Sequence, residues 1–226
     1  MRASALPAFV TAALLALCWI LFPPAKAICG CVFMLGLAGA SFIDLRQMII
    51  PDLFSIGLAA AGLALSLAFP ALHGFGPLVF AGGARSAAAA LLGLAIGSAF
   101  VLWLGLIGEI FLRKEVLGFG DVKFVGAIGA FCGWQGAVFS IFGGALVGAL
   151  VLLAAAAVDG FAPGRPALRG VEGFMRLESP DGQQAARVGW NVRFPFGPML
   201  ACAAALYFFA LHPWVDRYLA QYLLLF

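Results

Sequence analysis

The sequence predicts an all-α fold, a polytopic bundle of about seven transmembrane helices. The first observation is composition: 64% of the residues are hydrophobic, 10% are charged, and the mean hydropathy is +1.08. Soluble domains are about half apolar and about a quarter charged. The second observation is that apolar runs of spanning length alternate with short polar or proline-containing breaks. We treat residues 1–226 as one membrane-embedded domain with a polar loop at residues 159–193.

The first four predicted spans end at prolines or polar turns. They cover about residues 3–22, 28–43, 53–69 and 86–112. Pro23 and Pro24 end the first run, and residues 25–27 (Ala-Lys-Ala) resemble a signal-peptidase site, which leaves open whether the first helix is a cleaved signal peptide. Pro51 cannot continue a helix, and we expect Asp52 to cap the third span.

The apolar run after residue 121 is too long for one span, so we expect a break at residues 133–136 (Gly-Trp-Gln-Gly). This gives a short fifth span at 122–133 and a sixth at about 137–158. The loop at 159–193 holds five arginines, and a turn signal at 179–182 predicts a small β-hairpin. The seventh span covers about residues 199–211. Glycines spaced four apart in the predicted helices, as in Gly93 and Gly97, predict helix-packing faces; the same spacing occurs in Gly129/Gly133 and Gly144/Gly148.

The positions of lysine and arginine predict the orientation of the bundle. The side that holds the N-terminus and the loops at 44–52, 113–121 and 159–193 carries ten basic residues. They are Arg2, Arg46, Arg113, Lys114, Lys123, Arg165, Arg169, Arg176, Arg187 and Arg193. The other side carries Lys26, Arg85 and Arg217. The positive-inside rule places the side with ten in the cytoplasm, so Asp44 and Asp121 lie at similar depth on the cytoplasmic side.

Two aspartates in matching positions are the candidate catalytic groups. Asp44 ends one helix and Asp121 begins another, and a carboxylate near lipid is costly to retain without a function. The N-terminal dipole favours the anion of Asp121, whereas Asp44 has the opposite bias. Two nearby carboxylates tend to share one proton, an asymmetry that suits acid–base hydrolysis. We expect Gly118 and Gly120 to let a peptide approach and to adopt dihedrals that other residues cannot.

Other interpretations of these residues remain open. Lys123 can bias the aspartate pair or meet a lipid phosphate. Both aspartates can instead be simple interfacial caps, with Asp44 paired to Arg46 and Asp121 to Lys123. The absence of a basic cluster with interleaved aromatics argues against nucleic acid. Five dispersed cysteines and two histidines predict neither a zinc site nor a histidine-based triad.

At these residues the chain resembles the type IV prepilin peptidases, the bacterial branch of the Gly-x-Gly-Asp membrane aspartyl proteases. Three stretches carry the resemblance: residues 43–45 with 50–52, residues 114–115 with 118–123 and 129–134, and residues 194–198 (Phe-Pro-Phe-Gly-Pro). They occur in the family's order and span residues 43 to about 211.

The resemblance implies an aspartic endopeptidase of the bacterial inner membrane. It would cut the leader from prepilins or pilin-like secretion proteins at the cytoplasmic face. It implies Asp44 and Asp121 as catalytic residues, Gly118, Gly120, Lys123, Asp52 and Glu115 as supporting residues, and no metal or cofactor. Prepilin precursors and membrane lipid are the implied partners.

One departure from the family and two alternative functions are also considered. Many members carry a cysteine-rich domain between the first two helices and methylate the new N-terminus. Only residues 23–27 lie there in this chain, so we expect no N-methyltransferase activity. A presenilin-like intramembrane protease is one alternative, although Ile43, not tyrosine, precedes Asp44. A proton-coupled transporter is the alternative from another class.

Overall fold

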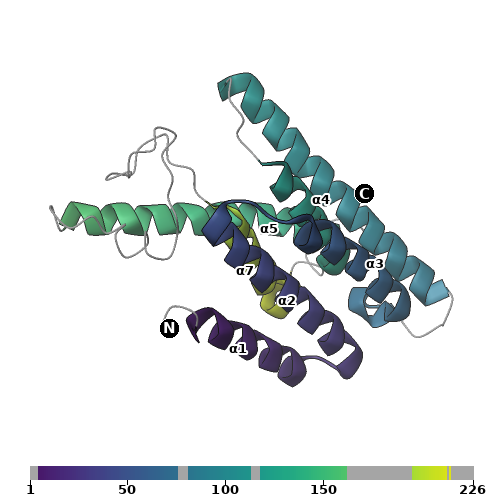
Figure 1. Cartoon of the computed structure of the whole chain (residues 1–226). Helices are drawn as coiled ribbons and strands as arrows, with labels where there is room; N and C mark the ends of the chain where they lie inside the picture. Colours follow the sequence, from purple (N-terminus) through teal and green to yellow (C-terminus); the bar gives the residue numbers. More distant parts are fainter. Residues whose placement is uncertain (1–4, 76–80, 113–117, 162–194, 213, 215–226) are drawn as a thin grey trace.

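The computed structural model describes residues 5–75, 81–112, 118–161, 195–212 and 214, which form an all-α helix bundle (Figure 1). The described residues are 92% helical and contain no strand. The predicted all-α membrane bundle is therefore confirmed. The β-hairpin predicted around residues 179–182 and the supporting residue Glu115 lie outside the described residues.

The helices follow the predicted spans closely. In chain order they are α1 (Ala5–Leu21), α2 (Pro24–Gln47), the π-helix η2 (Leu53–Gly57) leading into α3 (Leu58–Ala68), the 3₁₀-helix η3 (Pro70–His73), α4 (Ala81–Leu112), α5 (Phe119–Phe161), and α7 (Gly197–Leu206) leading into the π-helix η4 (Tyr207–Leu211). Pro24 occupies the first turn of α2, where its missing N–H costs nothing.

Two helix boundaries differ from the prediction in a way that matters for the site. α2 continues to Gln47, so Asp44 lies within its last turn rather than at its end. The helix then stops at Met48, which adopts a left-handed φ of 53°. α5 begins at Phe119, so Asp121 lies within its first turn.

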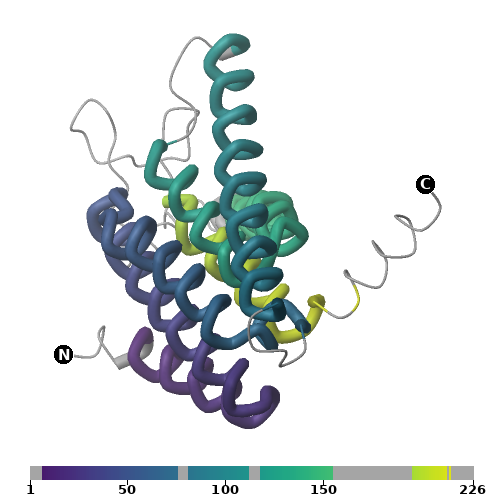
Figure 2. Tube along the Cα trace, turned by 90° about the vertical axis from the view of Figure 1, so that its right-hand side faces the viewer, coloured from purple at the N-terminus to yellow at the C-terminus, as the bar shows by residue number. Residues whose placement is uncertain are grey.

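Three helices in the described part of the chain are long and apolar enough to cross a membrane: Pro24–Gln47, Ala81–Phe111 and Phe119–Ala154. Shorter apolar helices cover Pro7–Leu21, Leu53–Ala68 and Gly197–Leu211. α4 is the longest unbroken helix among them, and its C-terminal end projects past the start of α5 in both views (Figures 1 and 2).

The break predicted at residues 133–136 is confirmed at Gly133. This residue has φ 70° and ψ 178° inside α5, a conformation that L-residues with a side chain rarely adopt. The segment therefore consists of two helices joined at a kink, as Figure 1 shows. Without this kink, a straight helix of 43 residues would be far longer than a bilayer is thick.

All three glycine pairs predicted as packing faces lie against neighbouring helices. A Cβ on Gly93 of α4 would overlap the carbonyl oxygen of Gly129 in α5. A Cβ on Gly144 would lie 3.2 Å from the backbone of Leu200 in α7. Such close backbone approach is how helices associate in lipid, where hydrophobic burial gives no drive.

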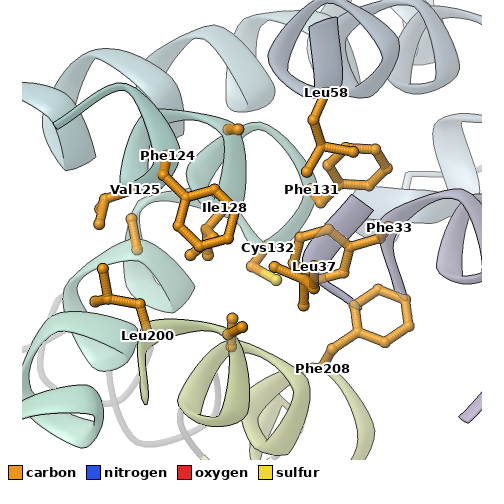
Figure 3. Packing of buried hydrophobic residues seen from close by; sticks show 14 of the residues in the cluster. Phe33, Leu37, Leu58, Phe124, Val125, Ile128, Phe131, Cys132, Leu200 and Phe208 are labelled. Carbon is orange, nitrogen blue, oxygen red and sulfur yellow. The ribbon is translucent and has the colours of Figure 1, made fainter. Parts of the chain in front are cut away.

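The centre of the bundle is filled by aromatic side chains from three elements. Phe33 of α2 stacks on Phe131 of α5 with ring centroids 4.7 Å apart, and lies 5.6 Å from the ring of Phe208 in η4 (Figure 3). Phe33, Phe124 and Phe131 are at most 1% exposed. This packing fixes α2, α5 and η4 relative to one another, and with them the residues near their ends.

Candidate active site

The carboxylate of Asp44 is buried between two helices. Asp44 is 5% exposed, and its main-chain oxygen accepts a hydrogen bond from Met48 at the end of α2. Its Oδ2 atom accepts a 2.9 Å hydrogen bond from the backbone N–H of Gly197, the first residue of α7. A charge-assisted bond of this kind is stronger than a neutral one and fixes the direction of the carboxylate.

Gly197 is a residue of the site for which no role was predicted, although it lies in the Phe-Pro-Phe-Gly-Pro stretch. A Cβ at this position would lie 2.6 Å from Oδ2 and 3.1 Å from Cγ of Asp44. Only glycine therefore allows the main chain to approach the carboxylate so closely. The signal that could have found it is a glycine directly before proline at the start of a predicted helix.

Asp121 is held by the start of its own helix. Its carboxylate accepts a hydrogen bond from the backbone N–H of Gly118, and its own N–H donates to the Gly118 carbonyl at 3.0 Å. This is the reach-back of an acidic residue in the first helical turn to the residue before the helix. The carboxylates of Asp121 and Asp44 are near enough to interact electrostatically.

The predicted difference in helix-dipole bias between the two aspartates needs correction. Asp44 does lie at the C-terminal end of α2, the unfavourable end for an anion. Its carboxylate, however, faces the N-terminal end of α7 through Gly197. Both carboxylates are therefore bound by N–H groups at helix starts, where negative charge is favoured. The end of α2 and the starts of α5 and α7 lie at one end of the bundle (Figure 2).

The prediction that Asp52 caps the third span is wrong. Asp52 makes no side-chain cap and has helical dihedrals. Its Oδ1 atom instead pairs with Nζ of Lys123 at 2.6 Å, which joins the start of η2 to the first turns of α5. Lys123 also lies over the ring of Phe119, 5.3 Å from its centroid. A pairing across two helices competes better for this carboxylate than the local backbone does.

The alternative in which Arg46 and Lys123 pair directly with the two aspartates is also wrong, because the described side-chain contacts of both basic residues are with other groups. Lys123 binds Asp52 and not Asp121. The guanidinium of Arg46 lies over the ring of Phe42, 4.2 Å from its centroid. The recorded partners of Asp44 and Asp121 are main-chain N–H groups.

The dihedral reason given for Gly118 and Gly120 is wrong as well. Neither residue has a left-handed φ. A Cβ on Gly118 would lie 3.6 Å from Oδ2 of Asp121, and one on Gly120 would lie 3.5 Å from Cβ of Ile50. These are ordinary van der Waals distances, so packing within the chain does not demand glycine at either position.

A second polar group lies outside the candidate site. Nδ1 of His73 lies 3.0 Å from Oγ of Ser86, and its Nε2 is buried without a hydrogen-bond partner among the described residues. Burial, reinforced by the nearby charges of His212 and Lys26, lowers the pKa of His73 to about 4. His73 is therefore a neutral structural residue that joins η3 to α4. In the described ranges, no three His, Cys, Asp or Glu side chains gather as a metal site would require.

Comparison with known proteins identifies relatives over the region that holds the two aspartates. A sequence model described as the type IV leader peptidase family matches residues 31–153. The chain is 34% identical over 115 residues to a protein named prepilin leader peptidase/N-methyltransferase from Aeromonas salmonicida, covering 50% of this chain and 35% of that protein. It is 29% identical over 187 residues to a protein of the same name from Xanthomonas campestris, covering 83% and 50%.

The chain thus spans between about a third and a half of the length of these relatives. No solved structure matches it significantly. The matched residues 31–153 make up more than half of the 226 residues and include Asp44, Asp52 and the segment 118–123. The chain therefore belongs to the type IV leader peptidase family.

Proposed function

We propose that this protein is a membrane aspartyl endopeptidase that removes the leader peptide from type IV prepilins or pilin-like secretion proteins. Asp44 and Asp121 would activate the attacking water at the cytoplasmic face of the inner membrane. The observation that carries this proposal is the meeting of two carboxylates from distant helices at one end of the bundle, each bound by a helix-start N–H. Membership of the type IV leader peptidase family supports it.

The chemistry divides between the two carboxylates. One, as the anion, takes a proton from water while the water oxygen attacks the scissile carbonyl carbon. The other, holding a proton, donates it to the carbonyl oxygen as the tetrahedral intermediate forms. Collapse of that intermediate breaks the C–N bond as the new amine takes the proton that the base carried. A hydroxyl proton of the intermediate returns to the other carboxylate, so that the C=O bond forms and the pair again holds one proton. Because the carboxylates form a coupled pair, we assign these roles to the pair rather than to either residue.

The main-chain donors position the carboxylates for this reaction. Gly197 holds Oδ2 of Asp44, which leaves Oδ1 free of that hydrogen bond for the reaction. Gly118 holds the carboxylate of Asp121 at the start of α5. Gly197 is the first residue of α7 and Gly118 directly precedes α5, so these helix starts orient the carboxylates before substrate arrives.

The distribution of basic residues supports an active site that faces the cytoplasm. Ten basic residues on the side of Asp44 and Asp121, against three on the other, favour a cytoplasmic active site. The named relatives are prepilin leader peptidases, which supports a prepilin or pilin-like precursor as the substrate. α1 ends at Leu21 and α2 begins at Pro24, which favours leader cleavage without N-methylation by a domain inserted between them.

The test is processing of a co-expressed prepilin in membranes, followed by mass spectrometry of the processed N-terminus. We expect one cut at the leader boundary and an unmethylated amine. Cleavage only within the apolar helix of the substrate would favour a presenilin-like protease. No cleavage, together with pH-dependent transport that requires either aspartate, would favour the transporter and overturn the proposal.

A further inference from the structure

Asp44 is closed off in this structure, whereas Asp121 is only half-buried. Asp44 is 5% exposed, and Ile50, six residues further along the chain, is 8% exposed. The proposed function requires water and a peptide bond to reach the carboxylate of Asp44. Some part of the structure around Asp44 must therefore move before substrate can bind.

Ile50 fills the space beside the carboxylate of Asp44. A Cβ built on Gly120 of α5 would lie 3.5 Å from Cβ of Ile50, and one built on Gly197 of α7 would lie 3.3 Å from its Cδ1. That second Cβ position is also 2.6 Å from Oδ2 of Asp44. The Ile50 side chain thus lies between the starts of α5 and α7, next to the oxygen that Gly197 holds.

The segment that carries Ile50 has an unfavourable backbone conformation at one end and an exposed ion pair at the other. It runs from Met48, whose φ of 53° is unfavourable for a residue with a side chain, to Asp52 at the start of a π-helix. Its outer contact is the ion pair between Asp52 and Lys123, whose side chains are 66% and 29% exposed. Exposed ion pairs contribute little to stability, so this contact opens at low cost.

We propose that residues 48–52 form a lid over Asp44. The Ile50 side chain keeps water and peptide from Asp44, and the Asp52–Lys123 ion pair holds the lid shut. When substrate binds, the lid swings away from the starts of α5 and α7, and the space that Ile50 leaves takes the residue next to the scissile bond. This inference rests on the proposed function for its biological purpose, but the motion can be measured without cleavage.

An engineered disulfide tests whether the lid must open. The Cβ positions of residues 50 and 120 lie 3.5 Å apart, which is within the range of natural disulfides. Oxidation of the variant Ile50→Cys/Gly120→Cys should reduce prepilin cleavage at least tenfold, and a reducing agent should restore it. The two single-cysteine variants, treated identically, control for the five native cysteines. Full cleavage by the completely crosslinked protein would overturn the lid.

A labelling experiment tests the same motion independently of catalysis. Dicyclohexylcarbodiimide reacts with accessible carboxyl groups in membranes, and the adduct on Asp44 can be quantified by mass spectrometry. Ile50→Ala and Asp52→Asn should each raise the labelling rate of Asp44 several-fold. Leu53→Ala, which truncates a side chain that is 74% exposed just beyond the lid, should leave it unchanged.

The two experiments separate failure of the lid from failure of the proposed function. Unchanged labelling in Ile50→Ala would overturn the lid whether or not the protein cleaves prepilin. Faster labelling would support it even if Asp44 proved unnecessary for cleavage. If the cysteine substitutions themselves abolished activity, the labelling rate of Asp44 would still show whether residues 48–52 act as a lid.

Discussion

The backbone N–H of Gly197 donates a 2.9 Å hydrogen bond to Oδ2 of Asp44, although 153 positions separate the two residues in the chain. This contact brings the start of the last described apolar helix to the end of α2. It also gives Asp44 a favourable partner at the C-terminal end of a helix, where a carboxylate is otherwise disfavoured. The hydrogen bond makes Gly197 a positioning residue for Asp44 in the proposed reaction.

Replacing Gly197 with alanine should reduce kcat for leader cleavage. The new Cβ would lie 2.6 Å from Oδ2 and would push the carboxylate away from the N–H. Hydrogen bonds to charged groups contribute about 1.5–3 kcal/mol, which corresponds to a loss of about 10- to 150-fold. The measurement is steady-state cleavage of a prepilin substrate in nanodiscs.

Gly57→Ala is the matched control for this substitution. A Cβ at Gly57 would have its nearest neighbour, Cδ1 of Leu53, at 3.5 Å, and the residue lies outside the site. Its kcat should stay near that of the wild type. Equal kcat values for Gly197→Ala and the wild type, both folded, would show that Gly197 does not position Asp44.

Replacing Gly93 with alanine should destabilise the bundle without touching the aspartates. The added methyl group would overlap the carbonyl oxygen of Gly129, and the backbones of α4 and α5 would have to separate. Overpacking of this kind costs about 1–3 kcal/mol. Thermal unfolding in detergent should therefore begin at a lower temperature than in the wild type or Gly57→Ala. An unchanged unfolding temperature would mean that α4 and α5 can move apart without loss of stability.

The buried hydroxyl of Ser55 should be dispensable for stability. Ser55 is fully buried in η2, and its Oγ has no hydrogen-bond partner in the described part of the chain. Removing an unsatisfied buried polar group is neutral or stabilising. Ser55→Ala should therefore unfold at the wild-type temperature or above it. Ser66→Ala, which loses a 2.7 Å bond to the Gly62 carbonyl, should unfold below it; the opposite order would contradict the recorded hydrogen bonds.

His73 should make stability depend on pH. Its pKa is lowered from 6.5 to about 4 by burial and by the charges of His212 and Lys26. Between these two pH values the unfolded chain binds a proton that the folded protein does not, so stability falls as pH falls through this window. Unfolding temperatures measured across it should decrease less steeply for His73→Gln than for the wild type. Identical slopes would mean that His73 titrates normally in the folded protein.

The helix order and the main breaks could be predicted from sequence because they depend on local composition. Apolar runs located the helices within a few residues, and Gly133 marked the kink in α5 because only glycine adopts its dihedrals readily. The glycine pairs predicted the packing faces because a residue without a side chain lets two helix backbones approach closely. These features depend on the hydrophobicity, size and backbone freedom of individual residues, which can be read directly from the sequence.

Partners across the bundle could not be predicted in the same way. Asp52 was expected to cap the helix beside it, but Lys123, 71 positions away, binds it. Gly197 received no role because the hydrogen bond to Asp44 depends on how α7 docks against α2. Pairing of this kind follows from tertiary packing, which a single sequence does not display.

The central claim is that Asp44 and Asp121 together activate water for peptide cleavage. The most direct measurement is single-turnover cleavage of a prepilin by Asp44→Asn and Asp121→Asn in nanodiscs, with Glu109→Gln as the matched acid-to-amide control on the exposed end of α4. Each aspartate variant should lose at least about 100-fold in rate, since general acid–base catalysis contributes about 10²–10⁴-fold. Glu109→Gln should keep the wild-type rate. Full cleavage by either folded aspartate variant would contradict the claim.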